Sequence, residues 1–361
     1  MFALVTGGGT GGHVTPALAI ADALVARGHA RTSIRFVGAA RGLEARAVPD
    51  AGYEIELLAL DGIQRSFASA AVVRSVRAVA AFGIAAVRCV GILHRLRPAV
   101  VVGVGGYASA PLVLAARLLR VPTLVHEQNA VPGLVNRIAV RLRAQPLVSF
   151  VIDRWPQAVD TGNPVRETVC RVERHPVVPP VVAIVGGSQG AGRLNDVGLG
   201  LYDRWRNRDD VAVRHVAGPK HHAECAARLA DLRRPDDRLA YELVDFERDM
   251  AGLYSSSALI VCRSGATTVA EVDVVGIPAV YVPWSGAAQD QQTANARAMV
   301  RLGAAEMVSD ADCDIDHLGP LVEGILSDPD RLHAMTQAAL HAGRPDAGAR
   351  IVDVIEGCIG A

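Results

Sequence analysis

One segment in the second half of the chain combines the residue types that hold a sugar nucleotide. Residues 262–271 read Cys-Arg-Ser-Gly-Ala-Thr-Thr-Val-Ala-Glu, an apolar strand that turns and begins a helix near Ala266. Unpaired N–H groups at a helix start carry partial positive charge, and with the Thr267 and Thr268 hydroxyls they suit a diphosphate. Glu271, more than one turn further, could accept both hydroxyls of a ribose. We therefore predict that a nucleoside diphosphate binds here.

The same order of strand, glycine loop and helix occurs three more times, at residues 2–16, 100–111 and 181–192. Glycine permits the tight turn and lets a ligand approach the backbone. One such loop is weak evidence. Four of them, divided between the two halves of the chain, predict a site shared by two nucleotide-binding-like sheets.

Two residues of the first half are candidates for a general base. His13 lies where the first loop becomes a helix, and a positive helix end disfavours imidazolium, so we expect a neutral ring near pH 7. A neutral imidazole can accept a proton, although a histidine that only shapes its loop fits the sequence equally well. Glu127, in the polar run 126–129 at a strand end, is the second candidate.

Neutral amides follow a second-half strand. Residues 289–292 read Gln-Asp-Gln-Gln and Asn295 comes shortly after them, and amides suit sugar hydroxyls because they both donate and accept. The alternating acids at 310–316 lack the central glycine and terminal glutamate of an EF-hand loop. We expect them to cap a helix near residue 317, and we predict neither a metal site nor a cofactor.

Two other nucleotide-binding folds do not fit the glycine loops. Gly7, Gly9 and Gly12 satisfy the GxGxxG pattern, but the end of the second strand, residues 36–40, offers no acid for a ribose diol. A P-loop needs Gly-Lys-Ser or Gly-Lys-Thr, and the single lysine, Lys220, lies elsewhere.

Composition indicates a soluble protein of two domains. The chain has 361 residues, 50% of them hydrophobic and only 4% aromatic. Its six cysteines show no paired spacing, which favours reduced thiols in a cytosol over disulfides or zinc. No basic leader precedes the first strand, so we expect no signal peptide. Gly105, Gly106 and Pro111 interrupt the uncharged run 99–116, which excludes a membrane-spanning helix there.

The net charge of zero conceals an uneven distribution. Residues 1–163 contain 17 arginines and 9 acids, and the remainder contains 20 basic residues and 28 acids. Between Asp61 and Asp153 the only acid is Glu127. Arginines there flank the apolar stretch 78–87, which would suit an anionic membrane surface, although a helix packed on a sheet explains it equally well. The scarcity of aromatic residues argues against nucleic acid.

The elements that position these residues form an α/β pattern. In the first half, expected strands alternate with helices at 16–27 and 111–120; these strands are 3–6, 33–37, 100–104 and 123–126. The pattern resumes with strands at 181–185, 211–216, 259–262 and 279–282. We predict two doubly wound parallel-sheet domains facing a deep cleft, at 1–163 and 164–347, and a closing helix at 348–361.

Six motifs together resemble the MurG family of glycosyltransferases. They occur in the family's order along nearly the whole chain: Gly8-Gly-Thr-Gly-Gly-His13, Gly105-Gly-Tyr107, His126-Glu-Gln-Asn129, Gly162-Asn-Pro-Val-Arg166, Gly186-Gly-Ser-Gln-Gly190 and Cys262-Arg-Ser-Gly265. The sequence departs from the family pattern at Ala110, where glycine is common, and in the loop 284–290, which is slightly longer than usual.

The resemblance implies a GT-B fold and a peripheral enzyme at the cytoplasmic face of the cell membrane. Its second domain would hold UDP-N-acetylglucosamine, and its first would face an anionic membrane surface and lipid I, the undecaprenyl-pyrophosphoryl-MurNAc-pentapeptide. The motif match implies further sugar-nucleotide contacts at Thr10, Gly11, Gly12, Asn129, Arg166, Ser188 and Gln292. It also assigns 266–271 to the diphosphate and ribose.

The family's reaction makes lipid II for peptidoglycan. A base would deprotonate the 4-hydroxyl of MurNAc, which attacks the anomeric carbon as UDP departs. Helix N–H groups, the two threonines and Arg166 or Arg263 would stabilise the departing diphosphate. Two alternatives remain open at this point: a UDP-N-acetylglucosamine 2-epimerase, and a non-catalytic protein that binds the nucleotide sugar.

Overall fold

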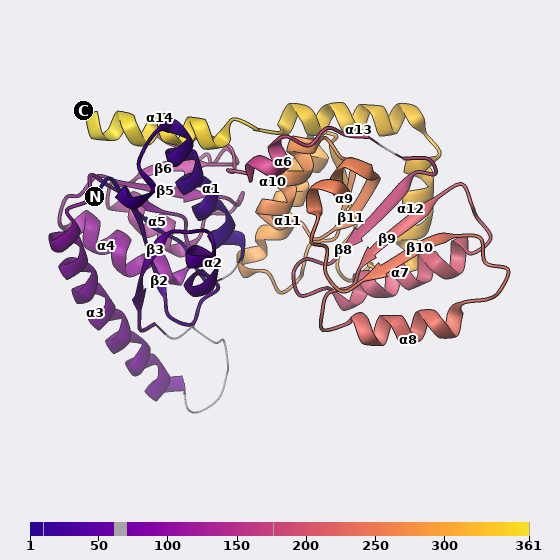
Figure 1. Ribbon diagram of the computed structural model, residues 1–361, viewed down its shortest axis with the longest axis horizontal. Helices are drawn as coiled ribbons and strands as arrows, with labels where there is room; N and C mark the ends of the chain where they lie inside the picture. Colours follow the sequence, from indigo (N-terminus) through magenta and orange to yellow (C-terminus); the bar gives the residue numbers. More distant parts are fainter. Residues whose placement is uncertain (10, 61–70, 176, 361) are drawn as a thin grey trace. The chain divides into compact units, whose positions relative to one another are not determined.

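Two separate parallel β-sheets organise the chain, one in each of two structural units (Figure 1). The computed structural model describes residues 1–9, 11–60, 71–175 and 177–360, and for residues 71–79 it describes the backbone alone. Unit 1 comprises Met1–Arg166 and Pro345–Ala361, and unit 2 comprises Glu167–Arg344. The last helix therefore belongs with the first sheet, although the whole of unit 2 precedes it in sequence.

The sheet of unit 1 has the strand order β3-β2-β1-β4-β5-β6-β7. All neighbouring strands are parallel: β1 (Ala3–Thr6), β2 (Ile34–Ala39), β3 (Glu54–Leu58), β4 (Val100–Gly103), β5 (Thr123–Glu127), β6 (Gln145–Val148) and β7 (Val159–Asp160). The order reverses between β1 and β4, where open α/β sheets bind ligands. The helices are α1 (Gly11–Arg27), α2 (Glu44–Asp50), α3 (Ala71–Leu96), α4 (Ala110–Leu118), α5 (Leu134–Arg141) and α14 (Ala347–Gly360).

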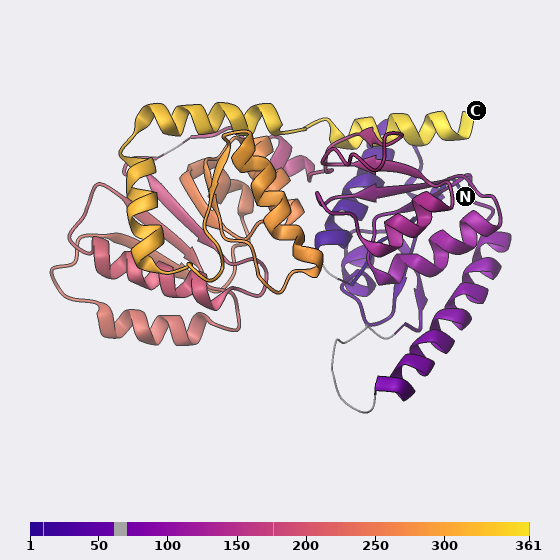
Figure 2. The same cartoon turned by 180° about the vertical axis from the view of Figure 1, so that it is seen from behind.

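Helix α14 packs against α1 and completes the core of unit 1 (Figures 1 and 2). Its apolar residues Ile351, Val352 and Ile355 are fully buried in the cluster that also contains the apolar face of α1. Arg27 donates to Asp353 at 2.6 Å and to Glu356 at 2.9 Å on the solvent side of this contact. The helical spacing of apolar residues in the last segment is thus explained by packing.

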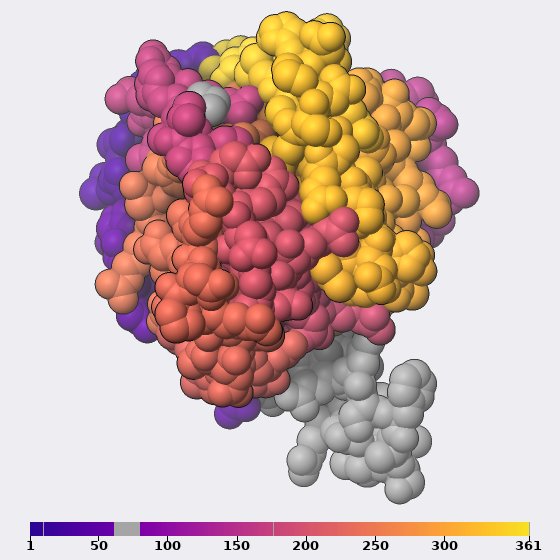
Figure 3. All heavy atoms as spheres, turned by 90° about the vertical axis from the view of Figure 1, so that its right-hand side faces the viewer, coloured from indigo at the N-terminus to yellow at the C-terminus, as the bar shows by residue number. Residues whose placement is uncertain are grey.

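The sheet of unit 2 has the strand order β10-β9-β8-β11-β12-β13. Its parallel strands are β8 (Val181–Val185), β9 (Ala212–Val216), β10 (Ala240–Val244), β11 (Ser257–Cys262), β12 (Ala279–Tyr281) and β13 (Ala305–Met307). The helices are α6 (Glu167–Cys170), α7 (Gly192–Trp205), α8 (His222–Leu232), α9 (Met250–Ser256), α10 (Ala266–Val275), α11 (Gln291–Arg301), α12 (Ile315–Leu326) and α13 (Pro329–Ala342). Figure 3 shows α12 and α13, in yellow, together on the surface of this unit.

The prediction of two doubly wound parallel-sheet domains is confirmed. One helix boundary differs from the prediction: α1 begins at Gly11, not at Pro16, so His13 lies in its first turn. None of the helices that the structure describes is long and apolar enough to cross a membrane.

Candidate functional site

The start of α10 in unit 2 has the features that the sequence predicted for a diphosphate site. Strand β11 ends at Cys262, and extended Gly265 precedes the first helical residue, Ala266. The Oγ1 atom of Thr267 is buried and has no hydrogen-bond partner among the described residues. A buried hydroxyl without a partner is costly, and this one lies in the first turn of the helix.

The turn before α10 is held by α11. Ser264 Oγ donates to the carbonyl of Gln292 at 2.9 Å, and Asn295 Nδ2 donates to the carbonyl of Ser264 at 3.2 Å. Asn295 is fully buried, so its amide supports the turn and does not face a sugar. Gln292 Oε1 accepts from the Trp284 N–H at 2.9 Å, which ties the loop after β12 to the start of α11.

Glu271, the expected ribose ligand, lies in α10 beyond Ala266 and is only 5% exposed. Its Oε2 accepts a 2.9 Å hydrogen bond from Tyr254 Oη of the neighbouring α9. A buried carboxylate needs such partners, because desolvation without them is expensive. The side chain is thus held in one direction before any ligand binds.

Arg263 is committed to the protein itself. It forms a 2.6 Å ion pair with Asp310 and donates to the carbonyls of Val282 and Pro283 at 3.0 and 3.3 Å. Burial alone would raise the pKa of Asp310, but hydrogen bonds from Ser285 and Arg263 and the arginine charge lower it. All of these contacts use one nitrogen, Nη1, and they fix Arg263 to the loop after β12, so its expected role toward a departing diphosphate stays a prediction.

The remaining acids of the 310–316 run support local structure. Asp314 caps α12 by accepting from the His317 N–H at 2.9 Å, as predicted.

Two further predicted ligands lie elsewhere in the chain. Ser188 is exposed in the loop after β8, and α7 follows this loop. Arg166 is the last residue of the first of the two segments that form unit 1.

In unit 1 a carboxylate of the chain occupies the first glycine loop. Glu44, 1% exposed at the start of α2, accepts from the Gly9 N–H at 3.0 Å and from the Ala39 N–H at 2.9 Å. A Cβ atom at Gly8 or Gly42 would collide with this carboxylate, so the glycines make room for it. Sequence reasoning missed Glu44; its only signal was an acid five residues after the end of β2.

His13 packs against the glycine turn that follows β4. A Cβ atom on Gly105 would lie 3.1 Å from His13 Cδ2, and one on Gly106 would lie 3.4 Å from Nδ1. Both glycines have positive φ, at 93° and 80°, so glycine is required for conformation as well as space. Burial lowers the pKa of His13 to about 4, against an opposing effect of the Glu44 charge. The ring is neutral at pH 7 as predicted, but burial is the main cause.

The carboxylate of Glu127 is saturated with hydrogen bonds. Its Oε1 accepts from the Asn129 N–H at 3.1 Å and from Asn129 Nδ2 at 3.3 Å. Its Oε2 accepts from the Gly133 N–H and from Asn136 Nδ2, both at 2.9 Å. Burial raises the pKa of Glu127, and these hydrogen bonds oppose that shift. Glu127 and Asn129 therefore brace the loop after β5.

Of the other predicted ligands in unit 1, Gly11 and Gly12 are exposed at the start of α1, next to His13. Thr10 lies outside the described residues. The structure thus brings His13, Gly11 and Gly12 together in one unit, and Ala266, Thr267, Thr268 and Glu271 together in the other.

Both units match models of one enzyme family. Residues 3–147 match the glycosyltransferase family 28 N-terminal domain, and residues 181–351 match the family 28 C-terminal domain. A protein of Anaeromyxobacter sp. strain Fw109-5 is 38% identical over 97% of this chain and 92% of its own length. It is named UDP-N-acetylglucosamine–N-acetylmuramyl-(pentapeptide) pyrophosphoryl-undecaprenol N-acetylglucosamine transferase.

Solved structures agree with this match. MurG of Acinetobacter baumannii superimposes with a TM-score of 0.80 at 29% identity, covering 99% of each chain. A UDP-N-acetylglucosamine 2-epimerase superimposes with a TM-score of 0.64 at 14% identity, over 97% of this chain and 94% of its own. At that identity the epimerase shares the fold alone.

Replacing Glu44 by glutamine should destabilise unit 1. The amide keeps one acceptor oxygen, so one of the two backbone N–H groups loses its partner inside the protein, at a cost of about 1–3 kcal/mol. Urea unfolding of the full chain measures the change, and Asp50→Asn, at an exposed carboxylate, serves as control. Equal unfolding midpoints for both variants would contradict the role of Glu44.

Proposed function

Because the chain belongs to glycosyltransferase family 28 and to its MurG members, we propose that it converts lipid I to lipid II by transferring N-acetylglucosamine from UDP-N-acetylglucosamine. The observation that carries this proposal is the 38% identity, over nearly the whole of both chains, to a transferase named for that reaction. The strand-to-helix turn at the start of α10, with Thr267 and Thr268 in the first turn of the helix, is a second observation that fits it.

The donor binds chiefly to unit 2 in this proposal. Helix N–H groups at Ala266 and the hydroxyls of Thr267 and Thr268 receive the diphosphate, where negative charge accumulates as the glycosidic bond breaks. Glu271 accepts the ribose hydroxyls. The remaining proposed contacts to the sugar nucleotide come from Ser188, Gln292, Arg166, Asn129, Thr10, Gly11 and Gly12.

We assign the base to His13 in preference to Glu127. The reaction needs a group that takes the proton of the MurNAc 4-hydroxyl while that oxygen attacks the anomeric carbon from the side opposite to UDP. All four hydrogen bonds to Glu127 come from the protein, so both of its oxygens are already used to hold the loop after β5. His13 is neutral at pH 7 and lies at a helix start beside exposed Gly11 and Gly12.

The first prediction concerns the substrates. With UDP-N-acetylglucosamine and a soluble lipid I analogue the protein should release UDP, and without the analogue it should release almost none. Release is measured with a coupled UDP assay. Conversion of the sugar nucleotide to its 2-epimer without acceptor would identify an epimerase, and binding without either reaction would identify a sensor.

The second prediction concerns His13. Replacement by alanine should lower kcat about 10²- to 10⁴-fold, the usual contribution of a general base. In the wild type the base works only when unprotonated, so kcat should be level above pH 6 and fall as the pH drops through about 4. Steady-state rates across pH measure both effects. A His13→Ala protein with wild-type turnover at every pH would remove His13 from this role.

We also propose that α3 binds the cytoplasmic face of the cell membrane. Its solvent-facing side exposes Ile84 and Val87, at 70 and 74%, next to exposed Arg88 and Arg95. Exposed apolar side chains beside arginines suit an anionic lipid surface. An acceptor attached to undecaprenol requires an enzyme that works at a membrane, which supports the same assignment.

The third prediction tests this surface. Binding to phosphatidylglycerol vesicles should weaken as salt rises, because salt screens the arginines, and Ile84→Glu should reduce it at least tenfold. Co-sedimentation measures the bound fraction. The control is Val178→Glu, at a 95% exposed valine of unit 2. Equal binding to neutral vesicles at high salt would contradict the proposal.

A further inference from the structure

The carboxylate of Glu271, which is proposed to bind ribose, accepts a hydrogen bond from Tyr254, a residue with no part in the proposed reaction. Tyr254 is 1% exposed, Glu271 is 5% exposed, and the hydrogen bond between them is 2.9 Å long. A hydroxyl that donates to a carboxylate away from water makes a strong and directional contact. The direction of the Glu271 carboxylate therefore depends on the position of the Tyr254 hydroxyl.

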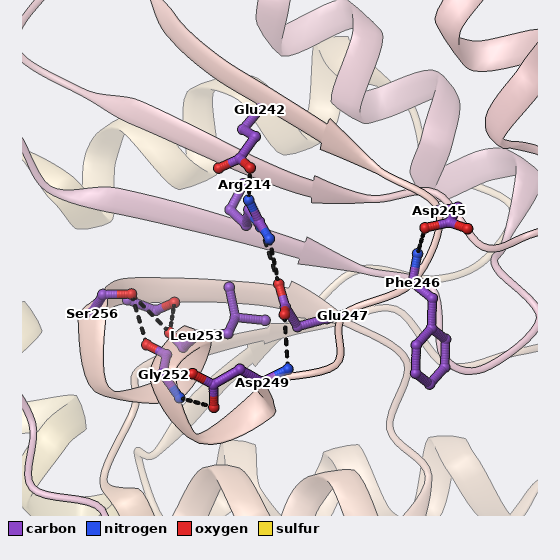
Figure 4. Close-up of polar contacts among 10 residues, drawn as sticks. Arg214, Glu242, Asp245, Phe246, Glu247, Asp249, Gly252, Leu253 and Ser256 are labelled. Atoms are coloured by element: carbon purple, nitrogen blue, oxygen red, sulfur yellow. Dashed lines mark hydrogen bonds and ion pairs between the residues drawn. The ribbon is translucent and has the colours of Figure 1, made fainter.

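Polar contacts hold the start of the helix that carries Tyr254 (Figure 4). Asp249 caps α9 by accepting from the Gly252 N–H at 2.9 Å. Glu247 accepts from the Asp249 N–H at 3.0 Å through one oxygen and from Arg214 at 2.7 Å through the other. Through these contacts β9, which carries Arg214, fixes the start of α9.

These contacts matter because α9 is not packed closely on the sheet beneath its start. A cavity of about 580 Å³ is lined by Arg214 and Glu242 of the sheet and by Gly252, Leu253 and Ser256 of α9. A helix this short gains little stability from its own backbone. Its placement therefore rests on its polar ends and on its contacts with α6 and α10.

We propose that Tyr254 is a positioning residue for donor binding: it aims the Glu271 carboxylate at the ribose hydroxyls of the nucleotide without touching the nucleotide. This inference rests on the proposed function, in which Glu271 binds the ribose. Removing the Tyr254 hydroxyl should weaken the recognition of a ribose diol and leave recognition of the uracil and diphosphate unchanged.

A second buried tyrosine of the same unit provides the matched control. Tyr281 in β12 is fully buried, and its hydroxyl has no hydrogen-bond partner within the described residues. Phenylalanine at position 281 deletes the same kind of atom, a buried tyrosine hydroxyl, from β12 of the same unit without breaking a described hydrogen bond. Unlike the Tyr254 hydroxyl in α9, this hydroxyl does not hold Glu271.

The experiment compares two ligands, UDP and its 2′,3′-dideoxy analogue, by calorimetry with the full-length protein. The wild type, Tyr254→Phe, Tyr281→Phe and Glu271→Gln are titrated with each. We expect Tyr254→Phe to weaken UDP binding about tenfold, as loss of a hydrogen bond to a charged group would, and to leave the analogue within twofold. Tyr281→Phe should leave both affinities within twofold.

The outcomes separate this inference from the function on which it rests. If Glu271→Gln reduces the preference for UDP over the analogue but Tyr254→Phe does not, the positioning role is wrong. The same holds if Tyr254→Phe weakens both ligands equally, because that indicates a general structural defect. If Glu271→Gln leaves the preference at its wild-type value, the ribose assignment fails, and the positioning role with it.

Discussion

Backbone N–H groups at a strand-to-helix turn need acceptors, and the two units meet this requirement differently. In unit 1, Glu44 accepts from Gly9 and Ala39, and Glu127 accepts from the loop that follows β5. In unit 2, the turn before α10 contains no such acid, and the Thr267 hydroxyl is left without a partner among the described residues. Unit 1 thus supplies its own anions at these loops, whereas the anion at the start of α10 comes from the donor in the proposed function.

This difference distinguishes two otherwise similar parallel sheets. The internal carboxylates hold the loops of unit 1. His13 follows the first of these loops and packs against the turn at Gly105 and Gly106. In unit 2, side chains hold the backbone around the turn before α10. Asn295 donates to this turn, and Arg263 fixes the loop after β12. In the proposed function this rigid turn receives the diphosphate without reorganisation, which is the arrangement that stabilises a leaving group.

Sequence patterns predicted the central strands and missed the edges. Each central strand of either sheet apart from β6 was expected, because apolar runs buried on both faces are easy to recognise. Four of the missed strands, β3, β7, β10 and β13, are the edge strands of the two sheets. Edge strands have one neighbour and carry polar residues such as Glu54 and Glu306. Strand β6 was missed because it contains Pro146, and proline is unusual within a strand.

The candidate site residues near α10 could be named from the sequence because a single segment contains them. Glu44 and Tyr254 could not, because each has a partner, Gly9 or Glu271, in a different segment of the chain.

The return of α14 to the first sheet has a consequence for synthesis of the chain. Unit 1 lacks part of its core until Ile351, Val352 and Ile355 have left the ribosome, whereas every residue of unit 2 has been made by then. Unit 2 can therefore fold first although most of unit 1 precedes it in the sequence. A gene divided after residue 166 would leave the apolar face of α1 uncovered, so the sheet that begins the protein is also the last to be completed.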